Sequence, residues 1–246
     1  MSDHVIVCNL EYAVRHLPDL SSKAGFKLEK TFLALIKPNI CGIYHPSLDL
    51  LSSIVGFLLS GAKSVVIGET SSMMHDPKEQ FESLGVNALV KRFGGSVRAV
   101  DLCEDERVKV RVSSPHALKE IDFPKTVLDS DVLVNVPRIG THSTTRLTCA
   151  IKNLLGLLPQ KRKFSVYHPL GVDKVIADIA SVIRPDLNVV DAGSKVILGV
   201  DVLAVDVVAC RFVDVDPMKV EHLRLVSEDR DEKLESLMKR VKVIDV

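Results

Sequence analysis

DVLVNVPRIGTHSTTRLTCAIKNLLGLL, residues 131–158, is the stretch that decides the fold. Its first part, 132–136, is a run of mainly branched apolar residues, typical of a strand buried on both faces of a parallel sheet, and Pro137 ends it. The hydroxyl-rich turn at 141–145 then offers several N-caps for a helix. Because leucine, isoleucine and alanine recur at helical spacing up to Leu158, we expect an amphipathic helix after this turn.

A helix that begins at 141–145, directly after a buried strand, predicts a binding site for an anion. Ligands of open parallel α/β sheets bind beyond the carboxyl ends of the strands. A helix N-terminus there presents unpaired N–H groups and a partial positive charge. Arg138, Thr141 and Ser143 would contact the anion, and His142 would serve as a general acid or base.

The charge pattern around this turn supports an anionic ligand. Between Asp131 and Asp173 the chain has 41 residues without an acidic side chain, six lysines or arginines and two histidines. At the chain's average of 32 acidic residues in 246, such a window would carry about five acids. Since the formal net charge of the chain is zero, this local positive charge indicates one specific anion. The alternative is that the basic loop 160–164 is simply a solvated surface segment.

Length and composition indicate a globular protein. With 246 residues, 46% of them hydrophobic and 26% charged, the chain can bury a large core, and we expect a single α/β domain spanning 1–246. The absence of a long apolar run and the charged start of the chain favour a cytoplasmic protein without a membrane partner. Five widely spaced cysteines contain no CxxC pair, and therefore give no disulfide framework and no iron–sulfur or zinc motif.

Two further features of the composition bear on partners and origin. Aromatic residues make up 4% of the chain and the net charge is zero, which argues against a nucleic-acid partner. Frequent valine, lysine and glutamate resemble the composition of a thermophile's protein.

The alternation of strand-like and helical segments predicts a three-layer, doubly wound α/β fold with a mainly parallel sheet. Ser47 is expected to cap a helix that runs to Leu59. The run 106–114 alternates with period 2 and predicts an antiparallel strand at an edge, while 241–246 predicts another edge strand. The main strands are expected at 32–36, 64–68, 132–136 and 187–191.

Polar side chains follow several of these strands, and in a parallel sheet they would converge on one cleft. In this cleft we expect Lys37, Arg138 and Lys152 to hold the anion, His142 to be the acid or base, and Asp191 to orient His142. The expected ligand-binding residues are Lys37, Asn39, Arg138, Thr141, Ser143, Lys152, Asn153 and Asp191.

Several motifs occur in a fixed order over about residues 32–226: IKPN at 36–39, the stretch at 128–156, and VLAVDVVACRF at 202–212. In this arrangement the chain resembles the bacterial and archaeal domain of unknown function 362 family. The most specific part is the family's turn of proline, a basic residue and threonine–histidine, followed by lysine–asparagine–leucine–x–glycine, here at 137–142 and 152–156.

The chain departs from the family's pattern at two places. Gly140 stands where the family usually has a second basic residue, and a glycine–proline-rich loop is largely missing between Gly193 and Val200. The resemblance implies a prokaryotic protein with an α/β fold and a site at the turn, without an established reaction. Many relatives also carry a ferredoxin-like iron–sulfur domain, whose cysteine spacing is absent from this chain.

Three classes of function stay open. The first is an enzyme or cofactor-binding protein for a small anionic ligand, whose cofactor the sequence does not name. The second is a metal or metal-cofactor site, because imidazole and carboxylate ligands suit divalent metals. The third is a non-catalytic accessory that docks an iron–sulfur or redox protein through the basic loop 160–164. The residues of the metal alternative are His45, His142 or His168 with Asp49 or Asp191.

Overall fold

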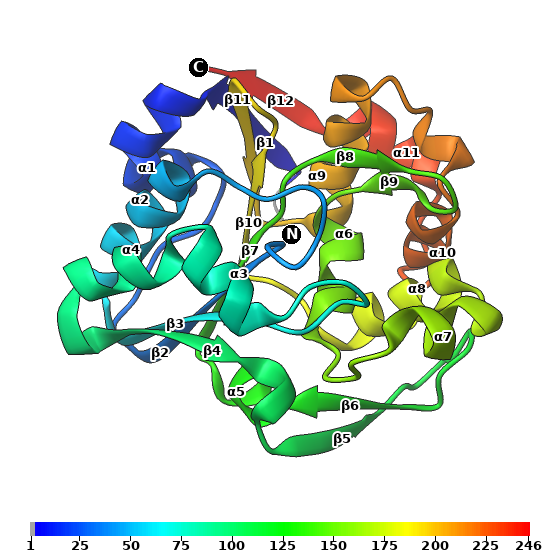
Figure 1. Ribbon diagram of the computed structural model, residues 1–246. Helices are drawn as coiled ribbons and strands as arrows, with labels where there is room; N and C mark the ends of the chain where they lie inside the picture. The colour runs from blue at the N-terminus through cyan, green and yellow to red at the C-terminus, as the bar shows by residue number, and fades with distance from the viewer. Residues whose placement is uncertain (1–2) are drawn as a thin grey trace.

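An eight-stranded sheet forms the middle layer of the computed structural model, which describes residues 3–246 (Figure 1). Among the described strands of this sheet, only β11 runs against the others, because its pairings with β1 and β10 are antiparallel and the remaining pairings are parallel. The mainly parallel sheet is therefore confirmed. From one edge to the other the strands are β12 (Lys242–Asp245), β1 (His4–Asn9), β11 (Lys195–Gly199), β10 (Leu187–Asp191), β7 (Val132–Val136), β2 (Thr31–Pro38), β3 (Ala62–Glu69) and β4 (Val97–Asp101).

Alternate residues of these strands pack into two separate cores, one on each face of the sheet. In β1, for example, Ile6 and Cys8 join one core and Val5 and Val7 join the other. The first core is covered by α1 (Leu10–Lys23), α2 (Leu48–Leu59), α3 (Pro77–Ser83) and α4 (Val86–Arg92). The second core is covered by α5 (Lys125–Asp129), α6 (Ala150–Asn153), α7 (Lys163–Tyr167), α8 (Val172–Val182), α9 (Val202–Ala209), α10 (Glu221–Glu228) and α11 (Leu234–Arg240).

The two helical layers lie on opposite sides of the sheet in Figure 1, which confirms the three-layer arrangement. Ser47 caps α2 as predicted, because its hydroxyl accepts a hydrogen bond from the Leu50 N–H at 3.3 Å. In the described part of the chain, no helix combines the length and the apolar content that crossing a membrane would require.

The edge-strand predictions had different outcomes. The segment 241–246 does supply the edge strand β12, which pairs with β1. The segment 106–114 contains the predicted antiparallel strand, β5 (Arg107–Arg111), but β5 pairs with β6 (Glu120–Pro124) in a separate two-stranded sheet and not with an edge of the main sheet. This ribbon runs along the bottom of Figure 1.

The largest correction concerns the turn and helix after β7. Residues 141–145 cap no helix, since β8 (Gly140–His142) and β9 (Arg146–Thr148) form an antiparallel hairpin there. Burial alternates along it: Leu147 is fully buried and Arg146 is exposed, and Arg146 takes a left-handed φ of 61°. The helix α6 begins only at Ala150 and continues as a 3-10 turn at Leu154–Leu157.

Candidate functional site

The N-terminus of α6 binds a carboxylate that belongs to the protein itself. Asp206, on α9, is fully buried, and its two oxygens accept hydrogen bonds from the Ala150 N–H at 2.7 Å and the Ile151 N–H at 2.9 Å. Burial raises the pKa of Asp206, while the Ile151 N–H lowers it. These N–H groups are therefore not free for an external anion. The start of α6 therefore holds the Asp206 carboxylate in place of the external anion that was expected at a helix start after β7.

A cleft lies beyond the carboxyl ends of β2 and β3, beside the hairpin that follows β7, and has two connected parts. The outer chamber is a hollow of about 360 Å³, and the inner chamber is one of about 160 Å³. Asn39, Thr148, Lys152 and Lys163 line both chambers, which joins them into one cleft. The outer chamber also has Ile43, Tyr44, Met73, Thr141, His142, Phe164, Tyr167, His168 and Val172 in its wall, and the inner chamber has Lys37, Glu69, Thr70, Asn153 and Gly156.

Lys37 lies in the inner chamber, but its charge is balanced within the protein. Its Nζ is 2.7 Å from Glu69 Oε1, and the two side chains are 1% and 3% exposed. The same Nζ donates hydrogen bonds to the Pro38 carbonyl and to Asn153 Oδ1. An ammonium has three N–H donors, and all three of these have an acceptor. Lys37 therefore has no free donor for the anion that it was expected to hold.

Asn153 is part of a buried chain of amides that ties α6 to the sheet. Its Nδ2 donates to the Lys37 carbonyl at 3.0 Å and to Asn135 Oδ1 at 2.7 Å. Asn135 in turn donates to Asn188 Oδ1 at 2.9 Å and to the Ala150 carbonyl at 2.9 Å. Because buried polar groups are costly unless paired, this chain holds the floor of the cleft in place.

Lys152 and Lys163 are the cations of the cleft that form no ion pair, although Asp173 attracts Lys152 and Glu69 attracts Lys163 from a longer distance. Burial lowers the pKa of Lys152 to about 7, and its Nζ donates to Thr148 Oγ1 at 3.2 Å. Burial also lowers the pKa of Lys163 to about 8, and its Nζ donates to Thr70 Oγ1 at 2.6 Å and to the Ser71 carbonyl. Within residues 3–246, neither ammonium has a carboxylate within 4 Å.

His142 lies at the end of β8 and lines the outer chamber together with Thr141. Its Nδ1 accepts hydrogen bonds from the N–H groups of Thr144 and Thr145, at 3.2 and 3.3 Å. Burial lowers the pKa of His142, and the nearby charge of Lys152 lowers it further. In the neutral ring the proton is therefore on Nε2, which is the nitrogen left to exchange a proton with a ligand.

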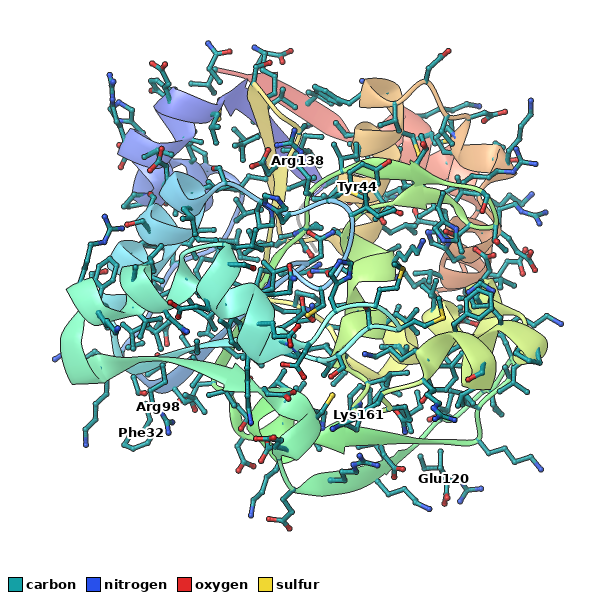
Figure 2. All side chains as sticks on the ribbon, viewed as in Figure 1. Phe32, Tyr44, Arg98, Glu120, Arg138 and Lys161 are labelled. Carbon is teal, nitrogen blue, oxygen red and sulfur yellow. The ribbon has the colours of Figure 1, made fainter. Side chains whose placement is uncertain are left out.

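Three predicted site residues lie outside the cleft. Arg138 and Asp191 form an ion pair of 2.6 Å, and Asp191 also accepts a hydrogen bond from the Ser47 N–H at 2.9 Å. Asp191 therefore fixes Arg138 and the start of α2, and does not orient His142. Ser143 is exposed at the turn of the hairpin. Figure 2 labels Arg138, near the top of the view.

Asn39 connects this ion pair to the cleft, because its Oδ1 accepts a hydrogen bond from the Arg138 N–H at 2.8 Å. For the metal alternative, the described residues contain no group of three or more histidine, cysteine or acidic side chains that could hold a metal ion. His45 and Asp49 are exposed, and the His168 ring packs against Phe164 with centroids 3.9 Å apart.

Among the residues of the cleft that were missed as site residues are Lys163, Tyr44 and Phe164. Lys163 lies in the acid-free window but was assigned to a surface loop, because consecutive basic residues are usually solvated. Tyr44 and Phe164 gave no signal, since loop aromatics show no periodicity. Tyr44, labelled in Figure 2, packs against Gly140, where a Cβ atom would lie 2.3 Å from the Tyr44 ring.

A larger hollow of about 580 Å³ lies elsewhere, beside α8 and α10. Its wall contains both arginines and acids, and one of the arginines, Arg230, already pairs with Asp201 at 2.9 Å. Because its charges are mixed and partly compensated, we place the candidate site in the cleft at the strand ends.

Comparisons with known proteins place the chain in a family and show its fold. The model of a family described as "Domain of unknown function (DUF362)" matches residues 34–211. Over 80 residues the chain is 29% identical to a thylakoid-associated protein of Synechocystis sp.. The matched segment covers 30% of this chain and 25% of that protein.

Two solved structures are similar to this one. The lactate racemase apoprotein from Thermoanaerobacterium thermosaccharolyticum has a TM-score of 0.50 and 15% identity, over 84% of this chain and 56% of that one. A Thermotoga maritima protein has a TM-score of 0.44 and 13% identity, over 89% of this chain and 59% of that one. At 15% identity the likeness to the racemase apoprotein shows a shared fold alone. The chain spans little more than half of these structures.

Proposed function

The chain belongs to the domain of unknown function 362 family, and we propose that it is a cytoplasmic, single-domain protein whose cleft binds a small anionic substrate or cofactor. The observation that carries this proposal is the pair Lys152 and Lys163. Both lysines line both chambers, both are partly buried, and neither has a carboxylate within 4 Å among residues 3–246.

The argument is electrostatic. A buried cation is costly unless an opposite charge lies close to it, and the lowered pKa values of the two lysines reflect that cost. The outer chamber contains two lysines, two histidines and no acidic residue. An anion bound beside these lysines would supply a closer opposite charge, raise their pKa values and form hydrogen bonds stronger than neutral ones.

The same groups could move protons. A general acid or base works best when its pKa lies near the working pH, which holds for Lys152 at about 7. His142 would exchange a proton through Nε2, because its Nδ1 is held by the hairpin. The ion pair of Lys37 and Glu69 would stay fixed beneath the ligand.

A thermal-shift experiment tests this proposal. Phosphate, sulfate, acetate, nucleotides and divalent metals are added separately to the wild type and to the Lys152→Met, His142→Ala and Lys161→Met variants. We expect at least one oxyanion to raise the melting temperature of the wild type and of Lys161→Met, whose lysine is exposed, but not that of Lys152→Met. The shift should shrink with salt and as the pH rises above 8, because both lysines then lose their protons.

Other outcomes would favour the alternatives. A shift with a divalent metal that a chelator reverses, without a shift from any anion, would favour the metal site. If no small molecule shifts the wild type, or if Lys152→Met responds like the wild type, the anion-binding proposal fails. Docking of an iron–sulfur or redox protein at loop 160–164 would then be the leading interpretation.

A further inference from the structure

Side chains with rings are concentrated in the wall of the outer chamber. Only 4% of the residues are aromatic, yet the wall of this one hollow includes Tyr44, Phe164 and Tyr167. Two of the three tyrosines of the chain are in this set. The imidazole rings of His142 and His168 complete it.

Several apolar side chains at this chamber are left uncovered. Phe164 is 55% exposed although its ring packs on His168, at a centroid distance of 3.9 Å and an interplanar angle of 33°. Ile43 and Met73, from the loops after β2 and β3, are 87% and 69% exposed. Exposed apolar groups that cluster in a hollow mark a binding surface, and a ring that is still half open can take a second aromatic partner.

The inner chamber differs in its chemistry. Its wall includes the buried ion pair of Lys37 and Glu69, and also Thr70 and Asn153. Lys152 and Lys163 line both chambers and therefore lie where the two meet. A ligand that is complementary to the whole cleft would place its negative charge at this junction, near the two lysines. Its flat apolar group would lie in the outer chamber, against the aromatic side chains.

We propose that the ligand of this cleft joins its anionic group to a flat aromatic ring, with the anion held by Lys152 and Lys163 and the ring in the outer chamber against Phe164. This inference rests on the anion-binding function proposed above and names the class of ligand. The two connected hollows, of about 360 and 160 Å³, are together within the size range of small-molecule sites.

The binding of four probes, measured by titration calorimetry, tests the anion and the ring separately. 2-Naphthoate carries both the anion and the flat ring, acetate carries only the anion, and 2-naphthalenemethanol carries only the flat ring. Cyclohexanecarboxylate carries the anion on a ring that is not flat. We expect 2-naphthoate to bind at least about tenfold more tightly than each of the others, because stacking adds to the ion pair. The Lys152→Met variant should bind both 2-naphthoate and acetate more weakly than the wild type does.

Phe164→Leu is the decisive variant, and Phe32→Leu is its control. Phe32 is 65% exposed and lies far from Tyr44 in Figure 2. Phe164→Leu should weaken 2-naphthoate roughly 2- to 10-fold without changing acetate binding, whereas Phe32→Leu should change neither.

The outcomes distinguish this inference from the proposed function. If acetate binds but 2-naphthoate binds no better, or if cyclohexanecarboxylate equals 2-naphthoate, the flat-ring inference is overturned and the anion site stands. An unchanged affinity of Phe164→Leu for 2-naphthoate would overturn it as well. If neither acetate nor 2-naphthoate binds, both the inference and the proposed function fail, and the exposed apolar groups are better explained by a protein partner.

Discussion

Lys37 Nζ and Glu69 Oε1 lie 2.7 Å apart at the floor of the cleft, in side chains that are 1% and 3% exposed. The Glu69 carboxylate also accepts hydrogen bonds from the N–H groups of Ile40 and Thr70, both at 2.9 Å. With both charges paired and hydrogen-bonded, the cost of removing them from water is largely offset. This pair links the ends of β2 and β3 and sets the shape of the inner chamber.

Removing one partner of this pair should strongly destabilise the fold. In Lys37→Met the Glu69 carboxylate stays buried without its cation, so we expect a loss of about 3–5 kcal/mol in the free energy of unfolding, measured by urea denaturation. Lys78→Met is the matched control. It breaks a pair with the same 2.7 Å distance to Glu104, but these side chains are 62% and 58% exposed, so the loss should be far smaller than in Lys37→Met. Similar losses in the two variants would contradict the structural role of the buried pair.

Gly156 leaves room for the Lys37 side chain. A Cβ atom at residue 156 would lie 2.6 Å from Lys37 Nζ and 2.7 Å from Lys37 Cε. Gly156→Ala should therefore displace the ammonium and cost about 1–3 kcal/mol of stability. Gly56→Ala, within α2, is the control, because a Cβ there meets nothing within 4 Å and alanine favours a helix by up to about 1 kcal/mol. A neutral Gly156→Ala would show that the floor of the cleft is loosely packed.

The parallel sheet could be predicted because its signal is local. The runs at 64–68 and 132–136 are rich in valine and isoleucine and are buried on both faces, and Ser47 precedes a helix with a regular apolar stripe. Lys37 and Asn39 lie at the carboxyl end of β2, and α6 follows β7 farther along the chain. The fold brings the two segments together, so that Asn39 and Lys152 line one cleft.

The hairpin after β7 could not be predicted from the helical spacing of leucines alone, because Leu147 fits a period of 2 as well as one of 3.6. In the structure Thr145, Leu147 and Cys149 are buried and the two residues between them are more exposed, which is the alternation of a strand. The N-terminus of α6 is occupied by the Asp206 carboxylate, which lies 56 residues after Ala150 in the sequence. The sequence pattern could not show this, because the position of Asp206 depends on tertiary packing. Lys163 was missed for the same reason, since only the fold buries it.

Gly140 and Tyr44 should behave as a coupled pair. Gly140→Ala would place a Cβ 2.3 Å from Tyr44 Cε2, so we expect a loss of about 1–3 kcal/mol. In the double variant with Tyr44→Ala the clash is gone, and the total loss should be smaller than the sum of the two single losses by more than about 0.5 kcal/mol. Additive losses in urea denaturation would show that the Tyr44 ring moves away freely.

Lys152 should reduce stability in a manner that depends on pH. Its pKa is about 7 in the fold, against 10.5 for an ordinary lysine, so the unfolded chain binds the proton more tightly. Below pH 7 the lysine is protonated in both states and the fold bears the full cost of burying the charge. As the pH rises from 7 to 10.5, the folded state loses its proton first and this cost declines.

Lys152→Met should therefore be more stable than the wild type at pH 6, by an amount on the order of a few kcal/mol, and nearly equal to it at pH 10.5. The free energies of unfolding of both proteins, measured in urea at the two pH values, give this difference. Lys161→Met, which removes an exposed lysine, should differ little from the wild type at either pH. If Lys152→Met is equally stabilised at both pH values, or destabilised at pH 6, then the charge of Lys152 does not cost the fold stability. The cleft then loses the group on which its assignment as an anion site rests.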